Sequence, residues 1–381
     1  MRNIIRNILS FLSWPIFAGL CIGVVTIVVT PSLRYSLGQQ LNSFLVPTNQ
    51  QPISYADAVS RAAPAVVNIF SRKSIDSPRN PLFDDPLFRH FFNSADIPQQ
   101  QRMSAALGSG VIINNEGYLL TNNHVIADSE EIIVSLYDGR EVSAELVGSD
   151  PETDLAVLKI SVENIQSITL GEPQKTRIGD VVLAIGNPFS VGQTVTLGII
   201  SATGRHGLGI NVYENFLQTD AAINPGNSGG ALIDARGKLL GINTAILNGK
   251  SSGSGVGIGF AIPADIAVNI MTDIITSGQA IRGWLGIEAR TLDDNIIRTY
   301  NLQQGSGVMI TSIYPNGPAD KAGIMVGDII TRINQQVIVN GREGMNLIAN
   351  IRPDDEVQVT LSRKGNLLKV KANVGTRPRD P

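Results

Sequence analysis

Short hydrophobic runs separated by turn residues fill the chain from about residue 107 to residue 246. The runs come at short spacing, and Asn-Asn, Asp-Gly and Ser-Asp pairs separate them. Many of the apolar residues are β-branched, and helical spacing is absent from this region. Such a series predicts about ten or more short strands that form one or two closed β-barrels.

Helical spacing occurs on both sides of this strand-rich region. Residues 54–63 predict a short helix at its start. Residues 263–277 place isoleucines at helical intervals and end at Gly278, which predicts a helix that links two domains. The final section, 283–374, has its own strand and turn pattern and is interpreted as a second domain.

An apolar segment precedes these domains. No charged side chain lies between Arg6 and Arg34, and residues 16–29 are nearly all apolar. About 20 apolar residues cross a bilayer as a helix, and Arg2 and Arg6 predict a cytoplasmic N-terminus. An uncleaved anchor over residues 8–33 is favoured because no Ala-x-Ala site follows; a cleaved signal peptide is the alternative.

The predicted organisation has five parts. They are a cytoplasmic stub with a transmembrane anchor (1–34), a tether (35–53), a barrel domain (54–262), a linker helix (263–281) and a C-terminal domain (282–375). Within the barrel domain, residues 71–104 contain four prolines and a cluster of phenylalanines without periodicity. A loop of that length is usually functional or disordered.

Composition narrows the class of protein. The net charge of −3 does not indicate a nucleic-acid partner, and 43% hydrophobic with 17% charged residues fits a packed globular protein. Cys21, within the apolar segment, is the one cysteine. Disulfides, cysteine catalysis and thiolate metal sites are therefore excluded from the rest of the chain, and no cofactor is expected.

A glycine-bracketed serine is the strongest chemical signal. Residues 218–230 read QTDAAINPGNSGG, and Ser228 is the serine in this run. The glycines allow a sharp turn that exposes the hydroxyl and lets the N–H groups of Gly226 and Ser228 converge. An acyl-transfer nucleophile and its oxyanion hole need that geometry. A plain Asn-Gly, Ser-Gly turn is the alternative.

A serine nucleophile also needs a base and an orienting carboxylate. Of the three histidines, His90 lies in the proline-rich loop and His206 in a glycine-rich turn, whereas His124 follows a predicted strand. Asp154 precedes an apolar strand, where it would be partly buried; a turn-capping role is the alternative. The order His124, Asp154, Ser228 is that of chymotrypsin.

Three motifs now point to a family. TNNHV at 121–125, TDLAVLK at 153–159 and GNSGG at 226–230 resemble the signatures of the HtrA serine proteases, which include DegP, DegQ and DegS. The resemblance implies a mainly β, chymotrypsin-like double barrel.

The resemblance also assigns roles to the residues. Ser228 would attack the peptide carbonyl, His124 would carry the proton and Asp154 would fix the histidine tautomer. The N–H groups of Gly226, Asn227 and Ser228 would bind the oxyanion. Digestive proteases carry an aspartate before the nucleophile, which pairs with a new N-terminus; the uncharged Asn227 excludes that switch.

The substrate pocket is expected beside the strand that follows the nucleophile. Ile242, Asn243 and Thr244 occupy this strand and offer no carboxylate to a basic side chain. A small or medium apolar residue such as Val or Ala is the expected substrate side chain.

The C-terminal domain resembles a PDZ domain. Residues 282–287, RGWLGI, match a loop that binds a peptide's terminal carboxylate, after which the peptide adds as a strand. The expected groove residues are Trp284, Leu285, Gly286, Ile287, Met345 and Ile348. Ordinary core positions are the alternative for the last two.

One PDZ domain with a membrane anchor most resembles the DegS branch of the family. This implies a periplasmic homotrimer on the bacterial inner membrane that cleaves a membrane-bound anti-sigma factor. The trigger would be C-terminal peptides of misfolded outer-membrane proteins, sensed through Arg205 and Phe189. A general quality-control protease is one alternative, and a scaffold or chaperone that binds peptides without cutting them is another.

Overall fold

The computed structural model describes residues 54–72, 105–187, 192–246, 257–292 and 307–378, with a few positions between 14 and 30. Within these residues no helix is both long and apolar enough to span a membrane. Most of the predicted anchor, most of the loop 71–104 and Phe189 lie outside the described residues.

The first barrel is closed and has six antiparallel strands. Their order is β1 (Val66–Arg72), β2 (Ala105–Ile112), β3 (Tyr118–Thr121), β6 (Leu155–Ile160), β5 (Glu141–Asp150) and β4 (Glu131–Ser135). Ile69, Leu119 and Leu158 are fully buried inside it. In β4 buried positions alternate with more exposed ones, as in a strand with one face in the core, whereas five of the six residues of β6 are buried.

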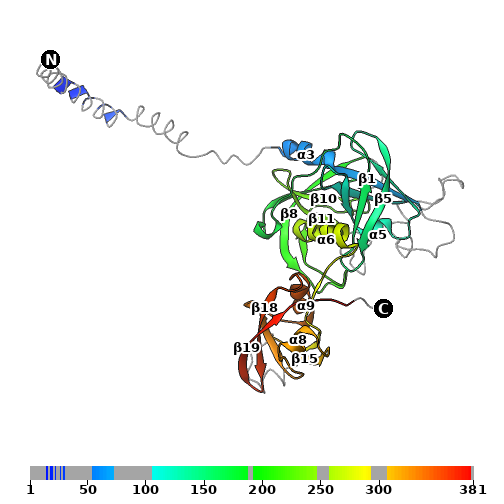
Figure 1. Cartoon of the computed structure of the whole chain (residues 1–381). Coiled ribbons are helices and arrows are strands. Elements are labelled where there is room, and N and C mark those ends of the chain that lie inside the picture. Colours follow the sequence, from blue (N-terminus) through cyan, green and yellow to red (C-terminus); the bar gives the residue numbers. More distant parts are fainter. Residues whose placement is uncertain are drawn as a thin grey trace, which may run out of the picture. The chain divides into compact units, whose positions relative to one another are not determined.

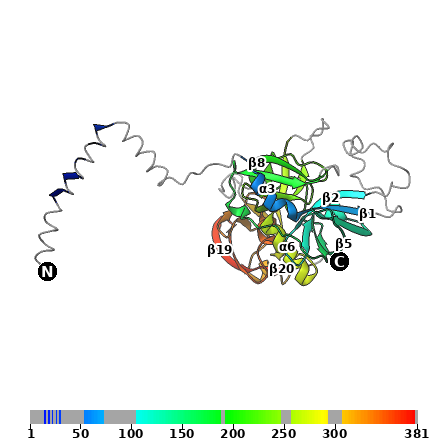
Figure 2. The ribbon, with the colours of Figure 1, turned by 90° about the horizontal axis from the view of Figure 1, so that it is seen from above.

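The second barrel is also closed. Its strand order is β10 (Ala231–Asp234), β11 (Leu239–Ile246), β12 (Gly259–Pro263), β9 (Phe216–Thr219), β8 (Thr194–Arg205) and β7 (Val181–Gly186). Seen from above, β1, β2 and β5 of the first barrel lie to the right of β8 of the second barrel (Figure 2). The predicted mainly β double barrel is confirmed.

Helices complete the barrel region. Helix α3 (Ala56–Ala62) and the 3-10 turn η1 (Ala63–Ala65) precede β1, and the 3-10 turn η4 (Pro173–Lys175) precedes β7. Helix α6 (Ala264–Ser277) confirms the predicted linker helix and ends at Gly278 in the left-handed conformation. Its apolar face packs on β5 and β6 of the first barrel and on β11 and β12 of the second.

The C-terminal domain is a separate sheet with its own core. The sheet order is β14 (Ile287–Thr291), β15 (Val308–Ile313), β16 (Ile329–Ile333), β18 (Glu356–Arg363) and β19 (Asn366–Asn373), with β17 (Gln336–Val337) on β16 and a separate pair of β13 (Gly283–Trp284) and β20 (Gly375–Thr376). Helices α8 (Pro318–Lys321) and α9 (Gly341–Ala349) flank it, and the Asn340 side chain caps α9 by accepting from Glu343 N–H. Figure 1 draws the part of this domain from residue 307 onward in orange to red.

The chain forms two compact units, Met1–Ser54 and Tyr55–Pro381. The second unit contains both barrels and the C-terminal domain. Contacts between this domain and the barrels therefore lie within a single compact unit.

Candidate active site

His124 and Asp154 form a tightly bonded pair on the first barrel. His124 lies on the short helix α5 (Asn123–Ile126), which the sequence pattern did not predict. Its Nδ1 is 2.7 Å from one Asp154 carboxylate oxygen, and its backbone N–H donates to the other at 2.9 Å. A single carboxylate therefore fixes both the ring and the backbone of the histidine.

The backbone around Asp154 reinforces this pair. The Asp154 carbonyl accepts hydrogen bonds from the side-chain amide of Asn122 at 2.9 Å and from the Asn123 N–H at 3.2 Å. Asp154 has a φ of +61°, a left-handed conformation that aspartate tolerates better than most residues. The turn before β6 and the start of α5 are thus joined at the site where the carboxylate meets the ring.

Thr244 connects the pair to the second barrel. Its hydroxyl donates to the same Asp154 oxygen that faces His124, at 2.9 Å. The sequence placed Thr244 in the substrate pocket, and its contact with Asp154 was not foreseen. Only the fold shows this contact, because the two residues lie 90 positions apart.

Ser228 lies in the loop between β9 and β10. Gly226 and Gly229 flank its turn with φ values of +100° and +80°. The Ser228 hydroxyl donates to the Thr244 carbonyl at 3.3 Å. The nucleophile candidate is therefore directed to strand β11 in this structure, while His124 is held by Asp154.

The backbone of this loop is only partly engaged. Asn227 N–H donates to the Asn224 carbonyl at 2.9 Å, which closes a turn. Within the described residues, the N–H groups of Gly226 and Ser228 have no acceptor. Asn227 is fully buried against Gly186, where an added Cβ would lie 2.7 Å from the Asn227 Cα.

The other predicted pocket residues are internal. Ile242 is fully buried and belongs to the barrel core. Asn243 is also buried, and its side-chain amide donates to the Ala231 carbonyl at 3.1 Å. Its own carbonyl accepts from Gly229 N–H at 2.8 Å, so Asn243 supports the turn that carries Ser228.

The predicted peptide-binding residues surround the start of the C-terminal sheet. Trp284 contacts Tyr314 edge to face, with ring centroids 5.2 Å apart, and Gly286 has a φ of +73°. Leu285 and Ile348 lie in the buried core of this domain, and Ile287 packs against it. Met345 remains 38% exposed on α9, the helix that packs against β14.

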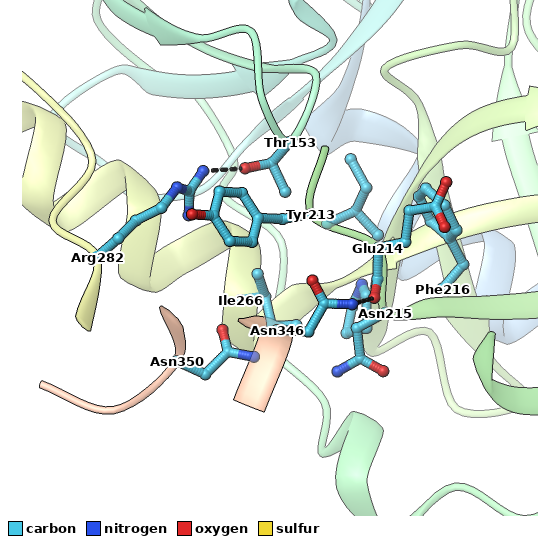
Figure 3. A pocket seen from close by; sticks show the side chains of 11 residues that line it. Thr153, Tyr213, Glu214, Asn215, Phe216, Ile266, Arg282, Asn346 and Asn350 are labelled. Carbon is cyan, nitrogen blue, oxygen red and sulfur yellow. Dashed lines mark hydrogen bonds between the residues drawn. The ribbon is translucent and has the colours of Figure 1, made fainter. Parts of the chain in front are cut away.

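A buried arginine joins this domain to the barrels. Arg282 is ion-paired with Asp150 and donates to the Thr153 hydroxyl at 2.7 Å (Figure 3). Its guanidinium stacks 4.0 Å from the centroid of the Tyr213 ring. Arg377 adds a 2.9 Å ion pair with Glu152. Since Thr153 directly precedes Asp154, this contact borders the candidate site.

A small pocket lies beside Arg282. Residues of both domains line it: Thr153, Tyr213, Glu214, Asn215, Phe216, Ile262, Pro263, Ile266, Arg282, Asn346 and Asn350. Asn346, on α9, points across it and donates to the Glu214 carbonyl at 2.6 Å (Figure 3). The helix beside the predicted peptide groove therefore contacts the loop that leads into β9.

Glu214 organises that loop. Its buried carboxylate accepts hydrogen bonds from the N–H groups of Leu208, Ile210 and Asn211. Burial opposes ionisation, but these donors and the charge of Arg342 outweigh it and lower the pKa of the Glu214 carboxyl. Sequence reasoning missed this residue, because a single glutamate in a loop carries no signal.

Arg205 lies at the end of β8, on the exposed side of the same loop. Its Nε donates to the side chain of Gln218 at 2.8 Å, and Gln218 lies on β9, the strand that leads to the Ser228 loop. Among the described residues, no group of three His, Cys, Asp or Glu side chains could hold a metal.

Comparison with known proteins identifies both domains. Residues 108–242 match the trypsin-like peptidase domain, and residues 283–374 match the PDZ domain. Serine endoprotease DegS of Salmonella typhimurium is 43% identical over 372 residues, which cover 94% of this chain and 96% of the relative. DegS of Escherichia coli K12 is 42% identical, with the same coverage of each chain.

Solved structures agree. The HtrA-type protease AlgW with a decapeptide is 52% identical, with a TM-score of 0.68, and the match covers 86% of this chain and 100% of that one. A serine endoprotease from Yersinia pestis is 43% identical, with a TM-score of 0.59, over 86% and 99% of the two chains. This chain is therefore a serine endopeptidase that belongs to the HtrA family, with a trypsin-like domain followed by one PDZ domain.

Proposed function

We propose that this protein is a membrane-anchored periplasmic endopeptidase whose activity is switched by peptides that bind its PDZ domain. Ser228 is the nucleophile, His124 the general base and Asp154 the group that orients the base. The observation that carries the assignment is the 2.7 Å contact between His124 and Asp154. The Asp154 carboxylate also accepts from the Thr244 hydroxyl, and the Thr244 carbonyl accepts from Ser228.

The reaction begins when Ser228 turns from the Thr244 carbonyl toward the ring of His124. His124 takes the hydroxyl proton as the oxygen attacks the substrate carbonyl, and Asp154 stabilises the imidazolium that forms. The oxyanion is bound by the N–H groups of Gly226 and Ser228. His124 then returns the proton to the leaving amine, and water releases the acyl group by the same steps.

The names of the relatives support the proposed location, and the resemblance of the motifs to the DegS branch supports the proposed substrate. DegS proteins match nearly the whole chain, and "probable periplasmic serine endoprotease DegP-like" of Pseudomonas putida F1 is 39% identical over 86% of it. We assign the apolar residues 8–33 to the inner-membrane anchor. The substrate is a membrane-bound anti-sigma factor, cut by a homotrimer when outer-membrane proteins misfold.

The proposed substrate pocket lies beside the residues of β11. Ile242, Asn243 and Thr244 form the backbone wall beside Ser228, and a Val or Ala side chain enters there. No carboxylate lies among them to select a basic residue.

Activation is assigned to the PDZ domain. The terminal carboxylate of a bound peptide binds at the loop of Trp284 to Ile287. The side chain of the last peptide residue contacts Met345 on α9. Asn346 on the same helix donates to the Glu214 carbonyl at 2.6 Å. A shift of α9 would therefore move the loop that follows Arg205. Phe189 belongs to the neighbouring activation loop.

A general quality-control protease is the second candidate. It would degrade many unfolded proteins, as the DegP-like name of one group of relatives suggests. The match favours regulated cleavage, because it covers 96% of the DegS relatives but 71% of the DegP-like ones.

The test uses the full chain in detergent and a fluorogenic peptide with Val before the scissile bond. An outer-membrane-type peptide with a free C-terminus should raise the rate by roughly 5–150-fold, for a coupling of about 1–3 kcal/mol. Its C-terminal amide should not. Arg205→Ala should respond less, whereas Arg236→Ala, which removes another exposed arginine, should respond as wild type.

Two results would overturn the proposal. Equal activation by the acid and the amide would remove the carboxylate as the trigger. Turnover by Ser228→Ala close to that of the wild type would remove the nucleophile assignment.

A further inference from the structure

A second serine lies directly behind the nucleophile. Ser109 is on β2 of the first barrel and is fully buried. Its backbone N–H donates to the carbonyl of Ser228 at 2.8 Å, and its hydroxyl donates to the carbonyl of Gly226 at 2.7 Å. One residue of the first barrel therefore holds the backbone on both sides of Asn227, at the residues that carry the oxyanion N–H groups.

The same hydroxyl also accepts a hydrogen bond. Asn187 N–H donates to it at 3.0 Å, and the Asn187 side chain accepts from Gly192 N–H at 3.0 Å. Asn187 and Gly192 are the described ends of the loop that follows β7. The hydroxyl proton is committed to Gly226 and a lone pair to Asn187, so Ser109 joins this loop to the Ser228 loop.

Close packing keeps Ser109 in this position. The Thr121 hydroxyl donates to the Ser109 carbonyl at 2.7 Å. A Cβ at Gly229 would lie 2.1 Å from the Ser109 carbonyl oxygen, and a Cβ at Gly186 would lie 3.1 Å from its hydroxyl. A side chain at position 186 or 229 would collide with its neighbours, so close packing on these sides gives the bond to Gly226 a defined geometry.

We infer that Ser109 is a positioning residue for the oxyanion hole. Its hydroxyl fixes the plane of the Gly226–Asn227 peptide, and its N–H fixes the Ser228 carbonyl. Gly226 has no side chain and a φ of +100°, so without this bond its backbone has many more conformations. The N–H groups of Gly226 and Ser228 are then less well held in one orientation. This inference rests on Ser228 as the nucleophile.

A positioning role predicts a specific kinetic effect. Loss of one oxyanion donor typically lowers kcat by about 10²–10³-fold. Ser109→Ala loosens the loop without removing a donor, so kcat should fall by about 10–100-fold while KM changes by less than about twofold. A peptide boronic acid, whose tetrahedral adduct places an oxygen in the hole, should lose affinity by the same factor as kcat/KM.

Thr331→Ala is the control. Thr331 lies on β16 of the PDZ domain, and its hydroxyl donates to the Thr360 carbonyl at 3.2 Å. The control also removes a hydroxyl hydrogen bond to a backbone carbonyl. It should lower the thermal unfolding temperature but leave kcat and boronate affinity within about twofold of wild type.

Ser109→Cys keeps nearly the same shape with a weaker donor, and its kcat should lie between those of Ser109→Ala and the wild type. A folded Ala or Cys variant of Ser109 with wild-type kcat would overturn the inference, as would equal kcat losses in Thr331→Ala and Ser109→Ala. If Ser228→Ala is inactive while Ser109→Ala is normal, only this inference fails. An active Ser228→Ala variant would instead remove the proposed function.

Discussion

His124 and Asp154 lie on the first barrel and Ser228 on the second. The two barrels differ in how many hydrogen bonds hold these residues in position. The histidine and the aspartate share two hydrogen bonds within the described chain, and neighbouring backbone groups hold the aspartate. Ser228 instead donates to the Thr244 carbonyl, and the N–H groups beside it have no acceptor within the described residues.

This difference follows from the surroundings of two parts of the proposed site. We call the His124–Asp154 pair the acid–base half and the loop that carries Ser228 the nucleophile half. The acid–base half lies in one turn and a short helix, close in sequence to the strands that hold them. The proposed nucleophile half lies in the loop 224–228, near Asn187 at the end of β7 and near the loop 206–215 that leads into β9. Loops are the parts of a fold that a bound partner can most readily rearrange. We therefore assign regulation to the nucleophile half.

The largest expected effect comes from breaking the preformed half. Asp154→Asn retains the left-handed backbone, because asparagine also tolerates it, but it places an amide where both His124 and Thr244 need an acceptor. We expect kcat to fall by about 10⁴-fold. Steady-state kinetics measure this change.

Asp354→Asn is its control. Asp354 also has a positive φ, of +72°, but lies in the PDZ domain. It should retain wild-type kcat. An Asp154→Asn variant within tenfold of wild type would show that the pair is not the acid–base half.

A smaller effect is expected where the two barrels meet. Thr244→Val keeps the shape of the side chain but removes the hydroxyl that donates to Asp154. Because the His124 contact remains, kcat should fall by roughly tenfold, as one neutral donor to a charged group contributes about 1.5 kcal/mol. Thr331→Val, which removes a hydroxyl bond within the PDZ domain, should leave kcat unchanged.

Separate values of kcat and KM sharpen this prediction. A residue that acts through Asp154 should lower kcat with little change in KM. A tenfold rise in KM with unchanged kcat would instead assign Thr244 to substrate binding.

The smallest effect concerns the loop at the domain contact. The pKa of Glu214 lies below its ordinary value of 4.5 in the folded protein. Its contribution to stability is therefore fully present above about pH 4.5 and is lost as the pH falls through the folded pKa. Glu214→Gln should make the unfolding free energy less dependent on pH below about 4.5, with a change of about 1 kcal/mol or less.

Thermal unfolding between pH 3 and 7 tests this expectation. Glu141→Gln, a change at an exposed position of β5, is the control and should retain the wild-type slope. An unchanged slope in Glu214→Gln would show that the carboxylate does not hold the loop.

The sequence was sufficient for the parts that depend on local pattern. Short apolar runs separated by turn residues predicted the barrels, and the spacing from residue 263 to 277 predicted α6, because both signals lie in neighbouring residues. The HtrA motifs marked His124, Asp154 and Ser228 for the same reason.

Other features depend on contacts between distant residues. Ser109 meets Gly226 across 117 positions, and Asn346 meets Glu214 across 132. Thr244 was expected in the pocket and was found to contact Asp154. A single hydroxyl or amide has no sequence period, so these contacts require the fold.

The most direct test of the central claim is a crystal structure of the full chain with a peptide boronic acid bound to Ser228. The account predicts that Ser228 leaves the Thr244 carbonyl and that a boronate oxygen lies within hydrogen-bonding distance of the Gly226 and Ser228 N–H groups. The His124–Asp154 contact should remain near 2.7 Å. A rearranged His124–Asp154 pair, or a boronate oxygen bound elsewhere, would contradict the account.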